Sequence, residues 1–269
     1  MLRNRTIWLI LLMLHTVVTG TAQELILFRT LPISARYLTT DGVGNIYVVL
    51  PDNTIVRYDE NGDSTGNYKS VINGSIGQVD ATNPLRILVF YPDYNKLVLL
   101  DKMLTPISEV AIQHIAPSGT RVVASAADGA IWMYDGFQAQ LKKIDITLQK
   151  VISSNDLRQE LQTVLTPNFM VEYNRQVYMS DTAKGIYIFD RFGNFVQSIP
   201  LQGIYYFQPM GSHIVYLKND TLFAWDMEKI KSATLHIPQR KNLPRMASLV
   251  RDKLYVLFDD ALQIFLLKD

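Results

Sequence analysis

The chain has 269 residues, with 26 Lys and Arg against 25 Asp and Glu, a formal net charge of +1, and no cysteine. A charge balance this even gives no general electrostatic attraction to nucleic acid or anionic lipid, so we predict no nucleic-acid partner. The lack of cysteine excludes disulfides and an N-terminal lipidated cysteine, so the fold must be stabilised by burial of its core.

The first 22 residues have the features of a secretory signal peptide. Two arginines precede an apolar run over residues 7–14, and Gly20-Thr21-Ala22 places small residues at the two positions that a signal peptidase reads. A membrane anchor is the alternative, but the run is shorter than the ~20 apolar residues that a spanning helix needs. His15 and Thr16 also interrupt it. We expect residues 23–269 to be an exported protein without a transmembrane segment, periplasmic, outer-membrane-associated or extracellular.

A phrase of alternating apolar residues that ends in aspartate recurs along the rest of the chain. The copies occupy residues 55–59, 97–101, 131–135, 186–190 and 222–226, and a sixth at 262–266 lacks the aspartate. Successive copies are 42, 34, 55, 36 and 40 residues apart, and the mean of about 41 is typical of one four-stranded blade of a β-propeller. We attribute the longest gap to a short helix or long loop over residues 151–161.

Alternation and turn chemistry predict the following strands in chain order. They cover residues 45–50 and 55–58; 85–91 and 96–100; 121–125, 130–134 and an outer strand at 141–144; 169–173, 176–180, 185–189 and 195–199; 204–207, 213–217, 221–225 and 233–237; 247–250, 253–258 and 261–267. The chain is thus predicted to be all-β, with six blades.

The last repeat has three strands, whereas the strand predicted over residues 24–29 belongs to no repeat. If that strand pairs as the missing fourth strand, it closes the ring and removes an exposed sheet edge. We therefore predict a single six-bladed propeller over residues 23–269, closed by its N-terminal strand. An open sandwich or two smaller β domains are the alternatives.

At these repeats the chain resembles propellers of the NHL and YWTD class. Gly44-Asn45-Ile46-Tyr47-Val48 and Ile186-Tyr187-Ile188-Phe189-Asp190 match the two strand types of that class, and residues 83–91 are similar to a segment of uncharacterised exported propellers of Gram-negative bacteria. The resemblance covers nearly all of residues 23–269, although the third and sixth repeats depart from the pattern. It implies six blades and a binding face, but members of the class bind different things.

The repeated aspartates follow an apolar strand and precede a polar turn. They are Asp59, Asp101, Asp135, Asp190 and Asp226. A carboxylate there accepts hydrogen bonds from backbone amides two residues on and so fixes the turn into the next strand. A cation-binding ring is the alternative, but equivalent positions in different blades lie far apart.

Eight residues are candidates for contact with a ligand or partner. Most aromatic residues alternate with aliphatic ones and are expected to pack between blades, but some stand at strand starts or turns. The candidates are the aromatic Tyr91, Tyr94, Tyr205, Tyr206 and Phe207 and the basic Arg240, Lys241 and Arg245. The basic cluster, together with Arg251 nearby in the sequence, could dock an acidic partner, although a solvated loop is the alternative.

No motif for catalysis, a metal or a cofactor is present in the sequence. His114, His213 and His236 lie in different repeats without a partner at metal-ligand spacing, so we predict no metal and no cofactor. Propeller hydrolases can assemble scattered carboxylates at the channel mouth, and turn residues that could serve there are Asp41, Asp80, Asp128 and Asp181.

These observations favour a monomeric, non-enzymatic scaffold that mediates protein–protein interaction in the cell envelope. The first alternative is a propeller hydrolase or lyase that acts on a sugar or lactone at the channel mouth. The second is a module that binds a small molecule or glycan.

We predict that the exported protein begins at Gln23, because cleavage after Ala22 fits the pattern of small residues. The intact mass and the N-terminal sequence of the protein recovered from the envelope measure this. A protein that keeps residues 1–22 and stays in the inner membrane would support the anchor instead.

Overall fold

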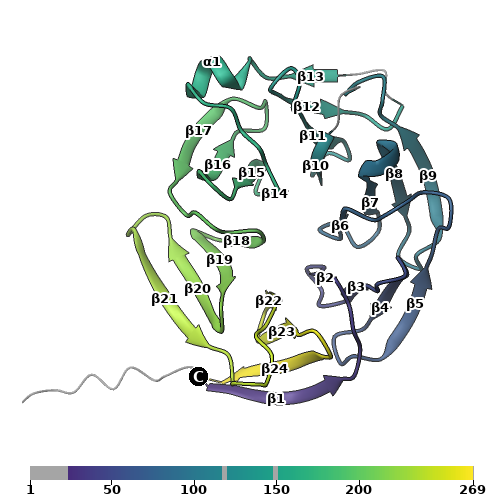
Figure 1. The fold of residues 1–269 in the computed structure, drawn as a ribbon, viewed down its shortest axis with the longest axis vertical. Coiled ribbons are helices and arrows are strands. Elements are labelled where there is room, and N and C mark those ends of the chain that lie inside the picture. Colours follow the sequence, from purple (N-terminus) through teal and green to yellow (C-terminus); the bar gives the residue numbers. More distant parts are fainter. Residues whose placement is uncertain (1–23, 117–119, 148–150, 269) are drawn as a thin grey trace, which may run out of the picture.

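The computed structural model describes residues 24–116, 120–147 and 151–268. The predicted signal peptide, residues 1–22, lies outside the described residues. Six four-stranded antiparallel sheets stand around a central axis (Figure 1). The all-β, six-bladed propeller is therefore confirmed, including the fold that the resemblance implies. No helix among the described residues has the length and apolar character needed to cross a membrane.

Blades 1 to 3 each contain four consecutive strands, ordered from the channel outward. Blade 1 consists of β2 (Tyr37–Thr40), β3 (Ile46–Val49), β4 (Ile55–Tyr58) and β5 (Ser64–Tyr68). Blade 2 consists of β6 (Gln78–Asp80), β7 (Ile87–Tyr91), β8 (Lys96–Leu100) and β9 (Pro106–Ala111), with the 3₁₀ turn η1 (Pro92–Tyr94). Blade 3 consists of β10 (Thr120–Ser125), β11 (Ile131–Asp135), β12 (Gln140–Ile144) and β13 (Val151–Ser153).

Blades 4 and 5 repeat this order, and blade 6 takes its outer strand from the other end of the described chain. Blade 4 consists of β14 (Phe169–Tyr173), β15 (Gln176–Asp181), β16 (Gly185–Phe189) and β17 (Phe195–Ile199), and it follows the helix α1 (Leu157–Leu161). Blade 5 consists of β18 (Phe207–Met210), β19 (His213–Lys218), β20 (Thr221–Asp226) and β21 (Lys231–His236). Blade 6 consists of β22 (Met246–Val250), β23 (Lys253–Leu257), β24 (Leu262–Lys268) and β1 (Glu24–Leu31).

The ring is closed by β1, which pairs antiparallel with β24, as predicted. Glu24 faces Lys268 and Leu31 faces Leu262, and the register shifts by a bulge between Leu27 and Arg29. Figure 1 shows β1 along the outside of blade 6, next to the end of the chain. Segments from the two ends of the described chain therefore form one sheet.

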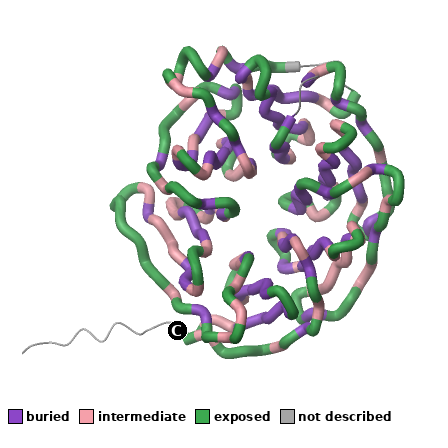
Figure 2. The backbone as a smooth tube through the Cα atoms, in the orientation of Figure 1, coloured by how far each residue is buried: buried purple, intermediate pink, exposed green. Residues whose placement is uncertain are grey.

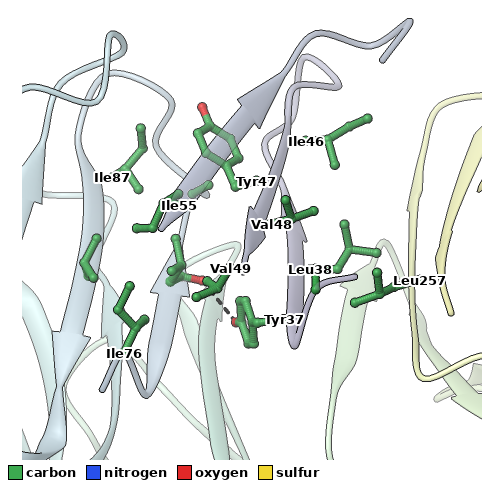
Figure 3. Close-up of a cluster of buried hydrophobic side chains, with 14 of the residues drawn as sticks. Tyr37, Leu38, Ile46, Tyr47, Val48, Val49, Ile55, Ile76, Ile87 and Leu257 are labelled. Carbon is green, nitrogen blue, oxygen red and sulfur yellow. Dashed lines mark hydrogen bonds between the residues drawn. The ribbon is translucent and has the colours of Figure 1, made fainter. Parts of the chain in front are cut away.

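Each blade buries both of its faces against its neighbours. All four residues of β3 are buried, and the buried residues in Figure 2 lie mostly on the inner strands. Figure 3 shows Tyr47 and Ile55 of blade 1 beside Ile87 of blade 2, with Leu257 of blade 6 on the other side of Leu38. This packing explains why the middle strands are continuously apolar rather than alternating.

Blade 3 corrects the predicted use of the repeated phrase. Residues 131–135 form the second strand of blade 3, whereas the same phrase forms the third strand of the other blades. The third strand is β12, and Asp145 directly follows it. The uneven gaps of 34 and 55 residues therefore reflect a change of strand, and the explanation by an inserted segment over 151–161 was wrong. That segment contributes β13 and α1, whose N-cap is Asp156.

Other strands also differ from the prediction, and β2, β6 and β9 were not predicted. The first strand of blade 5 covers Phe207–Met210 rather than 204–207, and residues 141–144 are the third strand of blade 3 rather than its outer strand. The first strands of blades 1 and 2 are only four and three residues long, too short to show a clear alternation.

The repeated aspartates hold turns, as predicted. Oδ1 of Asp59 accepts hydrogen bonds from the backbone amides of Asn61 and Asp63, both at 2.9 Å, and Asp101 and Asp190 repeat this pattern. At Asp226, the backbone amide of Lys229 is the largest cause that lowers the pKa of the carboxyl to about 2. Hydrogen bonds to the ionised form stabilise it, so these turns favour the charged carboxylate.

We predict that Leu31→Ala lowers the free energy of unfolding by about 2–3 kcal/mol, because Leu31 is buried where β1 meets the core. Leu27→Ala in the same strand is the matched control, since that side chain is half exposed, and its cost should stay below about 0.5 kcal/mol. Urea unfolding of both variants measures this. Equal costs would contradict the role of β1 in closing the core.

Candidate functional site

A hollow lies where the inner strands of all six blades end. Because the strands of each blade alternate in direction, the turns after the first strands gather at one end of the channel, which we call the pocket face. A cavity of about 700 Å³ opens there. Its lining residues are Thr40–Gly42, Thr82, Asn83, Ser125–Ala127, Val171–Asn174, Gln208–Gly211 and Leu249–Arg251.

Asp41 lies in this pocket, and internal donors occupy both of its carboxylate oxygens. Oδ1 accepts hydrogen bonds from the backbone amides of Val43 and Asn45. Oδ2 accepts from Asn45 Nδ2 at 2.6 Å and from the hydroxyl of Tyr47 at 3.1 Å. Burial, together with the negative charge of Asp41, raises the pKa of Tyr47. Asp41 therefore fixes the turn between β2 and β3.

Asp80 and Glu172 connect neighbouring blades near the same mouth. Asp80 accepts hydrogen bonds from both the backbone amide and the hydroxyl of Thr82, and its Oδ2 accepts from the amide of Ser125 in blade 3 at 2.7 Å. Glu172 of blade 4 accepts from the amide of Ala127 at 2.8 Å and from Trp132 Nε1 at 2.6 Å. These carboxylates therefore act as structural acceptors.

Side-chain amides cross-link the inner strands within the channel. Nε2 of Gln78 in blade 2 donates to the carbonyl of Val123 in blade 3 at 2.8 Å and to the carbonyl of Met170 in blade 4 at 3.0 Å. Gln208 of blade 5 exchanges two hydrogen bonds with the backbone of Leu249 in blade 6. These bonds satisfy backbone groups that the inner strands turn toward the channel.

The other end of the channel, where the inner strands begin, is covered by Tyr206, and we call it the Tyr206 face. The Tyr206 ring meets Tyr37 of blade 1 and Phe169 of blade 4 edge to face, at 5.5 Å in each case. Blades 1 and 4 stand opposite each other in the ring, so this side chain lies across the channel (Figure 1). Burial raises the pKa of Tyr206, and the charges of Arg36 and Arg245 oppose that rise.

The predicted aromatic contact residues lie at or beside the loops of the Tyr206 face, with Tyr91 at the end of β7 and Phe207 at the start of β18. Tyr94, Tyr205 and Tyr206 are exposed there, whereas Tyr91 and Phe207 are buried. The alternation of the strands explains this grouping, because loops between second and third strands lie on the same side as the starts of the first strands. The structure thus brings the exposed candidates to one face.

The basic candidates lie in the connection from blade 5 to blade 6. Arg240 forms an ion pair with Asp260 at 3.1 Å and lies over the ring of Phe258. Arg245 lies 3.5 Å from Asp259, and Lys241 is exposed. Ion pairs within the chain therefore engage two of the three charges.

Asp128 and Asp181 lie on different faces. Asp128, in a turn of the pocket face, forms an ion pair with Lys143 at 2.6 Å. Desolvation acts to raise the pKa of the Asp128 carboxyl, but hydrogen bonds, above all the one from Lys143, lower it overall. Asp181, the last residue of β15, accepts hydrogen bonds from the amides of Thr166 and Ala183. Neither residue lines the pocket.

The described residues contain no group of three or more His, Cys, Asp or Glu that could hold a metal ion. A serine, a histidine and an aspartate do stand in a row near the pocket face. Ser212 Oγ lies 3.4 Å from His213 Nδ1, and His213 Nε2 lies 3.7 Å from Asp226. These distances exceed those of a nucleophile and its base, and Lys229 already pairs with Asp226.

Sequence reasoning missed Glu172, Met210 and Leu249, which line the pocket, and it counted Arg251 only as a charge near the basic cluster, without placing it at the channel. A signal was present for Arg251. Asn174-Arg175 and Arg251-Asp252 each join a first strand to a second strand in two residues, so they mark turns at one end of the channel.

Comparisons with known proteins show the fold alone. No protein-family model and no curated protein matches the chain. A streptogramin B lyase structure is 13% identical over 91% of this chain and 98% of that chain, with a TM-score of 0.63. A catalytically inactive virginiamycin B lyase from Staphylococcus aureus with quinupristin is 11% identical over 86% of this chain and 80% of that chain, with a TM-score of 0.58. The Cps50 (Swd1) β-propeller domain of Myceliophteria thermophila is 10% identical over 91% of this chain and 100% of that chain, with a TM-score of 0.64.

We predict that Glu172→Ala costs about 1–3 kcal/mol of unfolding free energy, because it leaves the indole of Trp132 and the amide of Ala127 without an acceptor. In a Trp225→Phe background, the fluorescence of Trp132 should change as well. Glu228→Ala is the control, since Glu228 is exposed and its carboxylate has no hydrogen bond in the described part of the chain. Unchanged fluorescence and stability would contradict the role of Glu172.

Proposed function

We propose that the chain is an exported, non-enzymatic β-propeller that acts as a scaffold in the cell envelope and binds a protein partner through its Tyr206 face. The observation that carries the proposal is the set of exposed apolar and aromatic side chains on the loops of that face. Their exposed fractions lie between 62% and 87%, and they are Val71, Ile72, Tyr94, Tyr205 and Leu243.

These side chains come from several connections around the ring. Val71 and Ile72 lie between blades 1 and 2, Tyr94 lies within blade 2, Tyr205 precedes blade 5, and Leu243 precedes blade 6. Exposed apolar groups that gather on one face of a propeller are typical of protein contact sites, and tyrosine is enriched at the centres of such sites.

A chain of contacts makes the centre of this face rigid. Arg36, next to Tyr37, donates to Asn53 Oδ1 at 2.5 Å. Asn53 in turn donates to the carbonyl of Gly74, and the amide of Ser75 donates to Asp93, which precedes Tyr94. A surface that is ordered before binding loses less conformational entropy on association.

The charges of the face favour a partner recognised through apolar contact. Arg240 and Arg245 already have acidic partners within the chain, which leaves Lys241 at the rim. Polar groups at the rim of an interface contribute orientation and association rate more than affinity.

The alternative of a hydrolase or lyase gains no support from the pocket. The lining residues of the described chain include no histidine, and hydrogen bonds occupy both oxygens of Asp41 and Glu172. The lyases found among similar structures share the fold at 11–13% identity, and a fold by itself does not carry a reaction.

We predict that Tyr205→Ala lowers recovery of the envelope partner about ten-fold or more, since truncation of a central aromatic contact costs more than 1 kcal/mol. Cross-linking in the native envelope at endogenous expression, followed by quantitative mass spectrometry of the tagged protein, measures this. Phe192→Ala is the matched control, because Phe192 is an exposed aromatic residue on the turn between β16 and β17, on the pocket face. Equal loss from both variants, or no stoichiometric partner, would overturn the proposal.

A further inference from the structure

We propose that the cavity on the pocket face binds an apolar molecule that ends in a carboxylate. Its apolar body lies against Pro209, Met210 and Leu249, and its carboxylate is held by Arg251 and the hydroxyl of Tyr173. This site lies at the opposite end of the channel from the partner surface, so it is independent of the proposed function.

The size and form of the cavity suit a small molecule. Its volume of about 700 Å³ lies within the ~300–1,000 Å³ that is usual for ligand pockets. Gln78 bridges three blades within the channel, and Tyr206 covers the far end. The cavity is therefore entered from the pocket face.

Blades 4 to 6 supply the apolar part of the lining. Pro209 is buried, while Val171, Met210 and Leu249 are each partly exposed to the cavity. These four side chains come from three consecutive inner strands. Val171 also packs against the hydrophobic cluster between blades 4 and 5, and Met210 and Leu249 pack against the cluster between blades 5 and 6, so only part of each faces the cavity. An aliphatic or aromatic group that covers them removes this surface from water.

The polar capacity that remains in the pocket includes donors that a ligand can use. Internal hydrogen bonds occupy the carboxylates of Asp41 and Glu172. The hydroxyl oxygen of Tyr173 accepts from the amide of Gly211 at 2.9 Å, so the hydroxyl hydrogen is directed elsewhere and can be donated. A ligand that brings acceptors therefore matches this mouth.

Arg251 favours an acceptor that carries a negative charge. It occupies the two-residue turn between β22 and β23 with a φ of 56°, its side chain is exposed, and it pairs with no carboxylate in the described part of the chain. Its neighbour Asp252 does not line the cavity. A guanidinium binds a carboxylate through two parallel hydrogen bonds.

The balance of charges narrows the class of ligand. Arg251 is the one cation among the described residues that line the cavity, and the carboxylates of Asp41 and Glu172, although hydrogen-bonded, add two negative charges to the same lining. Arg251 can therefore balance only one negative charge of a ligand, whereas a phosphate carries up to two and is usually held by several donors and cations. A single guanidinium beside an apolar lining instead matches a monocarboxylate. The cavity therefore favours aliphatic or aryl-alkyl acids over phosphorylated compounds.

Methyl NMR on the mature protein with ¹³C-labelled methionine tests the site. Met210 lines the cavity, and exposed Met103 lies on a turn of blade 2 outside its lining and serves as the internal control. Octanoate should shift the Met210 signal saturably and leave Met103 unchanged, and octanamide should bind about ten-fold more weakly. Equal binding of acid and amide, or no shift of Met210 at millimolar octanoate, would overturn the proposal.

Two arginine variants separate the named site from general attraction. Arg251→Gln should weaken octanoate binding about ten-fold and leave octanamide binding unchanged. Arg175→Gln should change neither, because Arg175 has the same left-handed backbone (φ of 60°) in the equivalent turn of blade 4 but does not line the cavity. Equal loss from both variants would contradict the site.

A peptide experiment distinguishes the two possible sources of the carboxylate, a protein C-terminus and a free organic acid. Acetyl-Ala-Ala-Leu presents the same chemistry as the C-terminus of a protein, and its amide is the matched control. Tighter binding of the free-acid peptide than of octanoate assigns the ligand to a protein C-terminus, and the reverse order assigns it to a free organic acid. Failure of both acids at Met210 overturns the proposal and leaves the partner surface on the Tyr206 face untouched.

Discussion

The pairing of β1 with β24 is the constraint on which the rest of the structure depends. Each blade has two apolar faces that only its neighbours can cover, so an open arc of sheets leaves faces and edges exposed. Because β1 continues directly into blade 1 and pairs within blade 6, one strand joins the first and last blades. All six inner strands then stand around one axis, and both ends of the channel take their shape from this arrangement.

Within the closed ring, polar side chains form the hydrogen bonds that link the inner strands around the channel. Gln78 and Gln208 use their amides to bind backbone groups of neighbouring blades, while Asp80 and Glu172 accept from backbone amides across blade boundaries. Buried backbone groups without hydrogen-bond partners are costly, so these bonds stabilise the channel. They also engage the carboxylates that a catalytic site at the mouth of the channel would need. Asp41 and Glu172, the two acidic residues of the described pocket lining, are engaged in hydrogen bonds that hold the fold together.

The two faces therefore differ in chemistry. The Tyr206 face is covered by aromatic packing and presents exposed apolar side chains on loops. The pocket face also has exposed apolar side chains on its turns, Phe192 among them, but it is hollow and keeps donors and an apolar lining. Turns at the two faces belong to different strand connections, so the residues on one face can vary without disturbing the other. This separation is a general property of propellers, in which loops carry binding and the sheets carry stability.

The sequence by itself determined the features that depend on neighbouring residues. The aspartate turns could be predicted because each carboxylate bonds to amides two to four residues away, and the number of blades followed from the strand pattern. The same local reasoning failed in blade 3, where the phrase at 131–135 moved to the second strand. Only the tertiary structure decided which residues meet around the ring. Tyr91 is buried although its pattern allowed a surface role, and Asp41, Glu172 and Arg251 come from blades 1, 4 and 6 to one cavity. The physical reason is that closure of the ring brings together positions as far apart in the sequence as Asp41 and Arg251. A pattern of neighbouring residues does not contain the information on which distant residues will meet.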